Sequence, residues 1–346
     1  MSDSSNNISM QQSLTEVAPQ TALVRPVGSS VWHDLWADKA AFTGLLFLLL
    51  LALVAIFAPL IAPHDPTSQN IIARLKPPVW LAGGSSEHML GTDHLGRDLL
   101  SRVIHGARIS IMVGVATVLL AGSVGILVGL CAGYFGGRVD AFLVAVIDTV
   151  VAFPGLLLAL LILAVIGPSA TTVVVVLAFN GWMVYARVTR GIVLGMRSTP
   201  YIEAAETIGS KPRRVIFRHI LPNLTAPLLT LGTLEFARIV LAEAALSFLG
   251  LGIQPPASSW GLDVASGKEY MFRAWWLVTF PGIAIALTVL SVNLLASWFR
   301  VTSDPVEREK RYARRLVKTV KRQLRRNPVV DNPVADNPVA DNPVQS

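Results

Sequence analysis

Six stretches of this chain are long and apolar enough to cross a lipid bilayer, and they restrict its fold more than any other feature. A helix needs roughly 20 predominantly apolar residues to span the hydrocarbon core. Stretches of this kind lie at 40–62, 109–135, 139–166, 170–190, 224–251 and 274–299. Only 15% of the 346 residues are charged and 53% are hydrophobic, which excludes an ordinary soluble domain. The sequence therefore predicts an all-α membrane protein with six transmembrane helices.

Lysine and arginine are distributed unevenly over the segments that join these stretches. With the N-terminus inside, the inner segments carry 21 of the 29 basic residues and the outer segments carry seven. Basic residues concentrate on the cytoplasmic side of a membrane. We therefore expect a membrane protein with both termini in the cytoplasm. Residues 1–39 are then a cytoplasmic N-terminal tail, 40–62 a retained first span and 63–108 a loop on the outer side.

The C-terminal segment 300–346 is basic and repetitive. Eleven basic residues lie between Arg300 and Arg326, and an Asn-Pro-Val motif then recurs every five residues. A net charge of +7 could suggest nucleic acid, but topology and attraction to anionic lipid explain basic residues directly after an apolar stretch. We expect no nucleic-acid partner, an interfacial helix and then an extended tail, because proline at this period prevents a regular helix. Residues 1–30 are expected to be disordered because they are rich in serine, asparagine and glutamine.

A charged passage separates the fourth and fifth apolar stretches. Thr199 and Pro200 can cap and start a helix, and Gly209 can end it. Ser210 can cap a second helix that runs to Pro222. Helices this short are marginal on their own in water, so another surface must pack against them.

The first of these two helices has a narrow apolar face. Small Ala204 and Ala205 lie next to Ile202 and Ile208. A face of this kind suits insertion into a groove on a partner. On physical grounds alone, an ordinary basic loop at the membrane surface is an equal alternative.

The spacing within residues 199–223 is more specific than its composition. Glu203-Ala204-Ala205 is followed after three residues by Gly209, and after nine more by His219-Ile220-Leu221-Pro222. This pattern resembles the EAA loop of the membrane subunits of ATP-binding-cassette (ABC) importers, although His219 stands where that family usually has isoleucine. The resemblance implies that the loop docks on an ATPase subunit and transmits its motion. The residues that it assigns to coupling are Glu203, Ala204, Ala205, Ile208, Gly209, Leu221 and Pro222.

Longer motifs narrow the resemblance. They are LGTDHLGRDLLSRVIHGARIS from Leu90, GYFGGRVDAFL from Gly133, AFPGLLLAL from Ala152, EAALSFLGLGIQPPASSWG from Glu243 and AWWLVTFPG from Ala274. Over about 40–305 the chain is similar to the dipeptide, oligopeptide and nickel permease family, in its C-type membrane subunit. This implies a type I ABC importer permease fold in the bacterial inner membrane, with an ABC transmembrane type-1 core at 109–299 and with 63–108 as a periplasmic loop. The run NLLASWFRVTSDP, which ends the last span, departs from the acidic, glycine-containing run usual in that family.

The energy for transport is not expected to come from this chain. The sequence contains no phosphate-binding G-x-x-x-x-G-K-[S/T] loop. The resemblance implies a complex with a second, related permease subunit, two ATPase subunits that bind ATP and Mg²⁺, and an external substrate-binding protein. We therefore expect a transport subunit with no catalytic residue and no cofactor of its own. The resemblance makes di- or oligopeptides the leading substrates. Nickel or another small solute remains the alternative, because the external binding protein selects the solute.

Three of the charged residues within the predicted spans are candidates to line a passage: Glu235, Arg238 and Asp148. Each charge costs about 2.5 to 3.5 kcal/mol at the centre of a span, so these side chains should face the bundle or a passage through it. Glu235 and Arg238 either neutralise each other as an intrahelical pair or line a passage suited to the two charged ends of a short peptide. Asp148 is either structural or part of a proton relay, and with Glu235 it supports a rival hypothesis, an ion-coupled secondary transporter. Pro154 and Pro281 are expected to kink their helices.

The predicted outer loop contains several residues of metal-ligating types: His64, His88, Asp93, His94, Asp98 and His105. Their spacing shows no regular i, i+4 histidine pair and no compact group of carboxylates. We therefore expect no metal site here. The loop is expected to contact the binding protein or the partner subunit instead.

Overall fold

The computed structural model describes residues 35–36 and 38–303. The expectations for the polar N-terminal tail and the basic Asn-Pro-Val tail fall outside these residues. Among the described residues every regular element is a helix, apart from an isolated antiparallel bridge between Thr92 and Asp98. The all-helical fold expected from the sequence is confirmed.

Long helices account for most of the described chain. In order, the elements are α3 (Lys39–Ile56), α4 (Ala58–Ile61), η1 (Ile71–Ala73), α5 (Leu99–Phe135), α6 (Gly137–Val151), α7 (Gly155–Ile166), α8 (Ala170–Arg197), α9 (Pro200–Thr207), α10 (Pro212–Val215), η2 (Ile216–Ile220), α11 (Leu221–Phe248), α12 (Trp260–Gly267), η3 (Lys268–Tyr270) and α13 (Trp276–Ser303). Five helices of the described part are long and apolar enough to cross a membrane, and α6 with α7 makes a sixth span if the pair is counted as one.

Helix α5 packs along α8 and also contacts α3, α6 and α11. The α8 interface of α5 carries Gly125, Gly129 and Gly133, spaced by one helical turn each. A Cβ atom at Gly129 would lie 2.5 Å from the carbonyl oxygen of Ala186, and one at Gly125 would lie 2.1 Å from that of Trp182. Small residues at such positions let the backbones of two membrane helices approach closely, and van der Waals packing then holds them together.

The third predicted span is broken rather than continuous. Helices α6 and α7 meet at an angle of 79°, across the short break that contains Pro154. Proline has no backbone N–H to donate and favours an extended residue before it, so a helix ends readily at this position. The kink expected at Pro154 is confirmed. Pro281, by contrast, lies inside the continuous helix α13 near its N-terminal end, and no break is found there.

The charged passage forms the predicted first helix, α9, with Thr199 as the N-cap residue. The second part differs from the prediction. Its N-cap residue is Lys211 rather than Ser210, and the helix continues through the π-helical turn η2 into α11 instead of ending at Pro222. The π turn explains the difference, because its wider turn and the bond from the Leu221 N–H to the Ile216 carbonyl accommodate a proline inside the helix.

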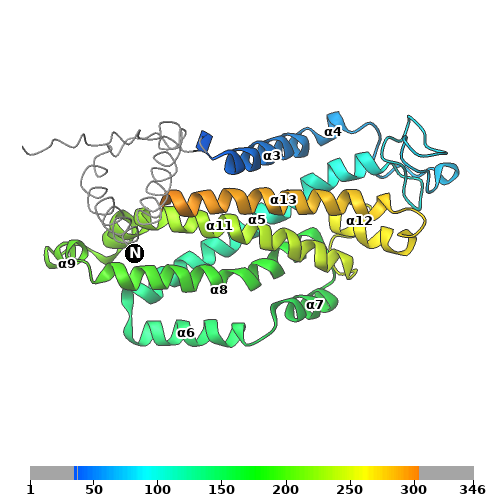
Figure 1. Cartoon of the computed structure of the whole chain (residues 1–346). Helices are drawn as coiled ribbons and strands as arrows, with labels where there is room; N and C mark the ends of the chain where they lie inside the picture. The colour runs from blue at the N-terminus through cyan, green and yellow to red at the C-terminus, as the bar shows by residue number, and fades with distance from the viewer. Residues whose placement is uncertain (1–34, 37, 304–346) are drawn as a thin grey trace, which may run out of the picture. The chain divides into compact units, whose positions relative to one another are not determined.

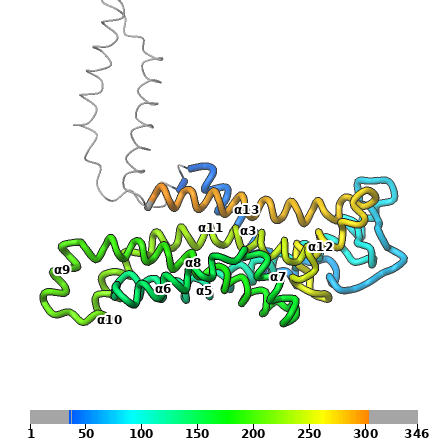
Figure 2. The backbone as a smooth tube through the Cα atoms, turned by 90° about the horizontal axis from the view of Figure 1, so that it is seen from below, coloured from blue at the N-terminus to red at the C-terminus, as the bar shows by residue number. Residues whose placement is uncertain are grey.

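Two contrasting regions lie at opposite ends of the long helices. Figure 2 shows α9 and α10 at one end, and α12 together with the loop before α5 at the other. The same separation is visible in Figure 1. We call residues 199–223 the elbow, and we call the loop 63–98 with the first turn of α5 and the segment 258–267 the cap.

Candidate functional site

The elbow is anchored to the bundle through one face of α9. Ile202 is 0% exposed and packs with Leu130 of α5, Val193 of α8 and Ile220 of η2. Apolar side chains from three other helices thus hold α9, which supplies the packing surface that a helix of its length requires. The sequence predicted that Ile202 and Ile208 share one apolar face that docks on a partner. This is wrong for Ile202, because Ile202 packs against its own chain.

The opposite side of the elbow is exposed. Ile208 is 84% exposed, and Glu203, Ala204, Gly209 and Pro222 are exposed as well. The remaining two predicted coupling residues, Ala205 and Leu221, are half-buried. Sequence reasoning overlooked Tyr201 and Phe217, which are large, apolar and also exposed here. Their signal was available, since both are aromatic residues within a short charged segment of the sequence.

Gly209 closes α9 with a left-handed residue. Its φ angle is +83°, and no atom lies within 4 Å of a Cβ built on it. The N–H groups of Gly209 and Ser210 donate to the carbonyl oxygens of Glu206 (2.9 Å) and Ala205 (3.1 Å). This is the Schellman arrangement, in which glycine satisfies the last carbonyls of a helix. The glycine is therefore required by backbone conformation and not by crowding.

His219, the departure from the family motif, has a specific partner. Its Nδ1 shares a short hydrogen bond with the Tyr201 hydroxyl, and the two rings meet edge to face with centroids 5.3 Å apart. This contact joins α9 directly to η2, so the two arms of the elbow are tied by side chains as well as through Gly209.

Two of the three candidate passage residues, Glu235 and Arg238, form the intrahelical pair considered from the sequence. The Nε atom of Arg238 donates to Oε2 of Glu235 at 2.8 Å. Glu235 is 6% exposed, whereas Arg238 is half-exposed and lines a cavity of about 520 Å³. The pair therefore neutralises itself and still presents a guanidinium to open space.

Asp148 also has a partner. Its carboxylate accepts a hydrogen bond of 2.7 Å from Arg187 of α8, and both side chains are exposed to about half. Arg187 lines the same cavity as Arg238. Sequence reasoning counted Arg187 only as a basic residue of an inner segment, although it lies within the fourth apolar stretch. Other residues that line the cavity are Phe153, Leu156, Asn180, Met183 and Ala242.

The cap holds a buried network of charges. Arg102 on α5 donates through Nε to Oδ1 of Asp263 on α12 at 2.8 Å, and Arg97 donates to Asp93 at 2.6 Å. All four side chains are buried. Burial raises the pKa of Asp263, and the bonds from Arg102 and Ser258 oppose that effect. Arg102 Nε also lies 3.8 Å from Oδ2 of Asp93, so Arg102 joins the loop before α5 to α12.

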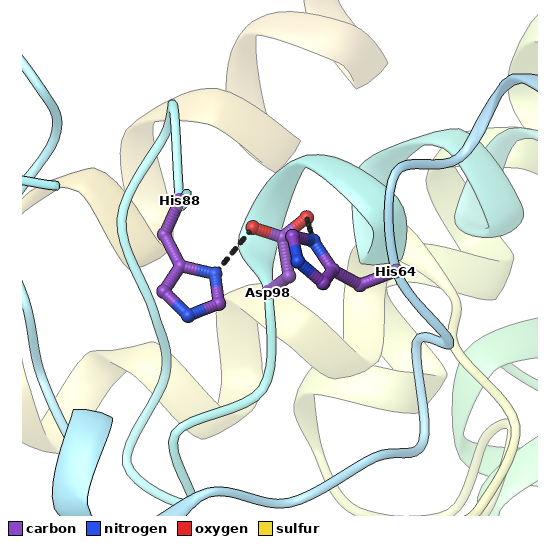
Figure 3. A group of neighbouring side chains, drawn as sticks. All are labelled: His64, His88 and Asp98. Carbon is purple, nitrogen blue, oxygen red and sulfur yellow. Dashed lines mark hydrogen bonds and ion pairs between the residues drawn. The ribbon is translucent and has the colours of Figure 1, made fainter. Parts of the chain in front are cut away.

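The structure brings together three of the six candidate metal-ligating residues of the cap: His64, His88 and Asp98. Figure 3 shows a nitrogen of each imidazole turned toward the Asp98 carboxylate. His88 Nδ1 lies 3.0 Å from Oδ1, and His64 Nδ1 lies 3.8 Å from Oδ2. No periodicity in the sequence predicts this grouping, because the three residues come from separate segments.

The other three candidates are engaged elsewhere. Asp93 pairs with Arg97, and His105 Nδ1 lies 3.0 Å from the Ser101 carbonyl oxygen. His94 stacks on Tyr270 with ring centroids 5.6 Å apart. Burial lowers the pKa of His94, which favours the neutral ring in that stack.

Comparisons with known proteins identify the family. Residues 125–308 match the model described as "Binding-protein-dependent transport system inner membrane component", and residues 28–78 match the N-terminal transmembrane domain of oligopeptide transport permease C. A di/tripeptide transport system permease protein of Pseudomonas aeruginosa is 43% identical over 79% of this chain and 90% of its own length. A dipeptide transport system permease protein of Haemophilus influenzae is 38% identical over 83% of this chain and 96% of its own length.

Among solved structures, the MetNI methionine ABC transporter in an inward-facing conformation matches with 15% identity and a TM-score of 0.48, over 59% of this chain and 96% of that one. The sequence matches are sufficient for the assignment. The chain belongs to the family of binding-protein-dependent transport system inner membrane components, whose members are multi-pass transport subunits.

Proposed function

We propose that the chain is the permease subunit of an ATP-driven importer that carries di- or oligopeptides across the bacterial inner membrane. The observation that carries the proposal is the 43% identity, over most of both chains, to a protein named as a di/tripeptide permease. The apolar helices supply the membrane-spanning part. A second, related permease subunit, two ATPase subunits and an external binding protein complete the transporter.

The elbow is the proposed contact with the ATPase. Ile208 and Tyr201 give it exposed apolar side chains, and the arginines of the same segment are exposed as well. Because Ile202 fixes α9 to α5 and α8, a force on the exposed side reaches those helices without first melting the elbow. The basic residues of the elbow support a cytoplasmic position for it, and both termini are proposed to lie on the same side.

The cavity beside α6, α7, α8 and α11 is the proposed part of the passage that this chain contributes. Arg187 and Arg238 both line it, and each remains half-exposed although it is paired with a carboxylate. A guanidinium in this state can exchange its partner for the carboxylate of a peptide. Its own Asp or Glu is then free to meet the peptide ammonium group.

The same pairs argue against the ion-coupled secondary transporter. Asp148 and Glu235 were its candidate ion-coupling residues, and both form ion pairs with arginine. Neither is therefore a lone carboxylate within its span. This favours the ATP-driven importer.

The test is transport in proteoliposomes. The chain reconstituted with its partner subunits should take up labelled dipeptide only when the binding protein is outside and ATP is on the ATPase side. Uptake by the chain alone, driven by an ion gradient, would contradict the proposal. Uptake of Ni²⁺ instead of peptide would support the ATP-driven importer but contradict the peptide substrate.

The passage can be tested separately with Arg187→Gln. Charge-assisted hydrogen bonds contribute about 1.5 to 3 kcal/mol, so loss of the guanidinium should lower peptide uptake about tenfold or more. Arg190→Gln is the matched control. Arg190 lies on the same helix and is also paired with an aspartate, but it does not line the cavity. Equal effects of the two substitutions would remove Arg187 from the passage.

A further inference from the structure

The cap contains a group of side chains with the composition and dimensions of a metal site. His64, His88 and Asp98 each offer one ligand atom, and these atoms all lie within 4.8 Å of one another. Two ligands that bind one Zn²⁺ at about 2.0 Å with tetrahedral angles are roughly 3.3 Å apart. His88 Nδ1 lies 3.0 Å from Oδ1 of Asp98 and His64 Nδ1 lies 3.8 Å from Oδ2, so both contacts are near that value but reach different oxygens of one carboxylate. Binding of one ion by all three residues would require the His64 ring to move toward the position that His88 and Asp98 share.

The His64 ring has an unused nitrogen in this group. Its Nδ1 is buried and has no hydrogen-bond partner, because the nearest carboxylate oxygen is 3.8 Å away. A buried polar atom without a partner is costly, and most such atoms in proteins are paired. A cation between the rings and the carboxylate would satisfy this nitrogen.

The side chains around the ligands hold them in place. Asp98 Oδ2 accepts hydrogen bonds from the Ser101 N–H at 2.8 Å and from the Ser101 hydroxyl at 2.7 Å. The same hydroxyl oxygen accepts a bond of 3.0 Å from the backbone N–H of His64. Second-shell bonds of this kind orient the ligands of metal sites and raise affinity. Ser101 therefore positions two of the three ligands at once.

We propose that His64, His88 and Asp98 bind one Zn²⁺ ion, with a water molecule as the fourth ligand. Two imidazoles and one carboxylate suit a borderline first-row cation, and they do not suit Ca²⁺ or Mg²⁺, which take oxygen ligands. This departs from the expectation drawn from the sequence, which rested on the irregular spacing of these residues. The proposal is independent of the transported solute.

The ion would join three segments of the cap. His64 follows α4, His88 lies in the middle of the long loop, and Asp98 caps the N-terminus of α5. Where metal binding occurs only in the folded state, its free energy adds to folding stability. The expected role is structural: the ion fixes the loop against α5 next to the buried charge network.

The test uses the full chain, purified through a tag without histidine and with its partner subunits if they remain bound. After dialysis against micromolar Zn²⁺ and then against metal-free buffer, bound zinc is measured by mass spectrometry. We expect one zinc per chain for the native sequence, and at least a tenfold loss of affinity for His64→Gln and for His88→Gln. His94→Gln, in the same loop but outside the group, is the matched control and should keep the metal.

His64→Gln is the safer of the two variants, because His64 is 34% exposed at its side chain and its backbone bond to Ser101 is unaffected. Replacement by Co²⁺ gives a second measurement that needs no variant: a four-coordinate site produces strong visible absorption. Native chain without bound zinc overturns the proposal, and so does zinc that is retained equally by both variants. Weak, six-coordinate Co²⁺ absorption would also overturn it. In each of these cases His88 serves only as a hydrogen-bond partner of the α5 cap residue.

Discussion

The cap and the elbow treat their charged residues in opposite ways. In the cap, Asp93, Arg97, Arg102 and Asp263 are buried and bonded to one another. In the elbow, Glu203 and Arg213 are exposed, and large apolar side chains such as Ile208 lie beside them. Both regions join long helices, so the difference does not follow from their place between spans.

The contrast shows which end of the molecule pairs its charges on its own. Charged groups that leave water need partners, and the cap supplies them for its four buried charges from within the chain. The elbow exposes apolar side chains, which suits a surface that a second protein covers. The cap should therefore matter for folding, and the outward side of the elbow should matter for assembly.

The largest expected effect on stability is in the cap. Asp263→Ala leaves the Arg102 guanidinium buried without its main partner, which should lower the free energy of unfolding by about 3 to 5 kcal/mol. Thermal unfolding of the purified chain in detergent measures this. The double variant Arg102→Met with Asp263→Leu should be less damaging, because it removes both charges together. A single variant as stable as the native chain would mean that the network is not structural.

The next effect tests the inward side of the elbow. Ile202→Ala removes a fully buried side chain and should cost about 2 to 5 kcal/mol. The measurement is again thermal unfolding, supported by protease sensitivity of the elbow. Little change would mean that α9 is not held by the cluster it contacts, and the elbow would then resemble an independent loop.

A smaller effect is expected at the joint. Gly209→Val places a β-branched residue at φ +83°, which should cost about 1 to 2 kcal/mol locally and lower ATP-dependent uptake. Gly209→Asn is the control, because asparagine accepts the left-handed conformation and open space surrounds the site. If both variants impair uptake equally, contact of the glycine backbone with a partner is responsible and not its conformation.

The smallest effect on stability is predicted for the outward side. Ile208→Glu should change the free energy of unfolding by no more than about 0.5 kcal/mol, because Ile208 is 84% exposed. Recovery of the ATPase subunits with the purified chain should nevertheless fall strongly. Normal recovery together with normal uptake would remove Ile208 from the coupling surface and weaken the contrast between the two regions.

Much of the elbow could be predicted from local signals. Pro200 at the start of α9 and Gly209 at its end act through their own backbones, so the sequence is enough to place them. The continuation past Pro222 could not be predicted, because it depends on a π turn that the packing of Ile216 and Ile220 against other helices supports. The orientation of Ile202 was missed for the same reason.

The charged residues show the same limit. Glu235 and Arg238 are neighbours on one helix turn, so their pairing could be expected from spacing. Arg187 and Asp148 are 39 residues apart, and no spacing rule connects them. Asp148 was therefore treated as a lone carboxylate, although its neighbour in space is an arginine.

By itself, the sequence determined the all-helical membrane fold, the break at Pro154 and the family, because hydropathy, proline geometry and motif spacing are local properties of the chain. The tertiary structure decided which distant residues meet: Arg102 with Asp263, 161 residues away, and His64 with His88 and Asp98. The physical reason is that ion pairs and metal ligands require separations of a few ångströms, and only the packing of α5 against the surrounding helices and loops sets those separations.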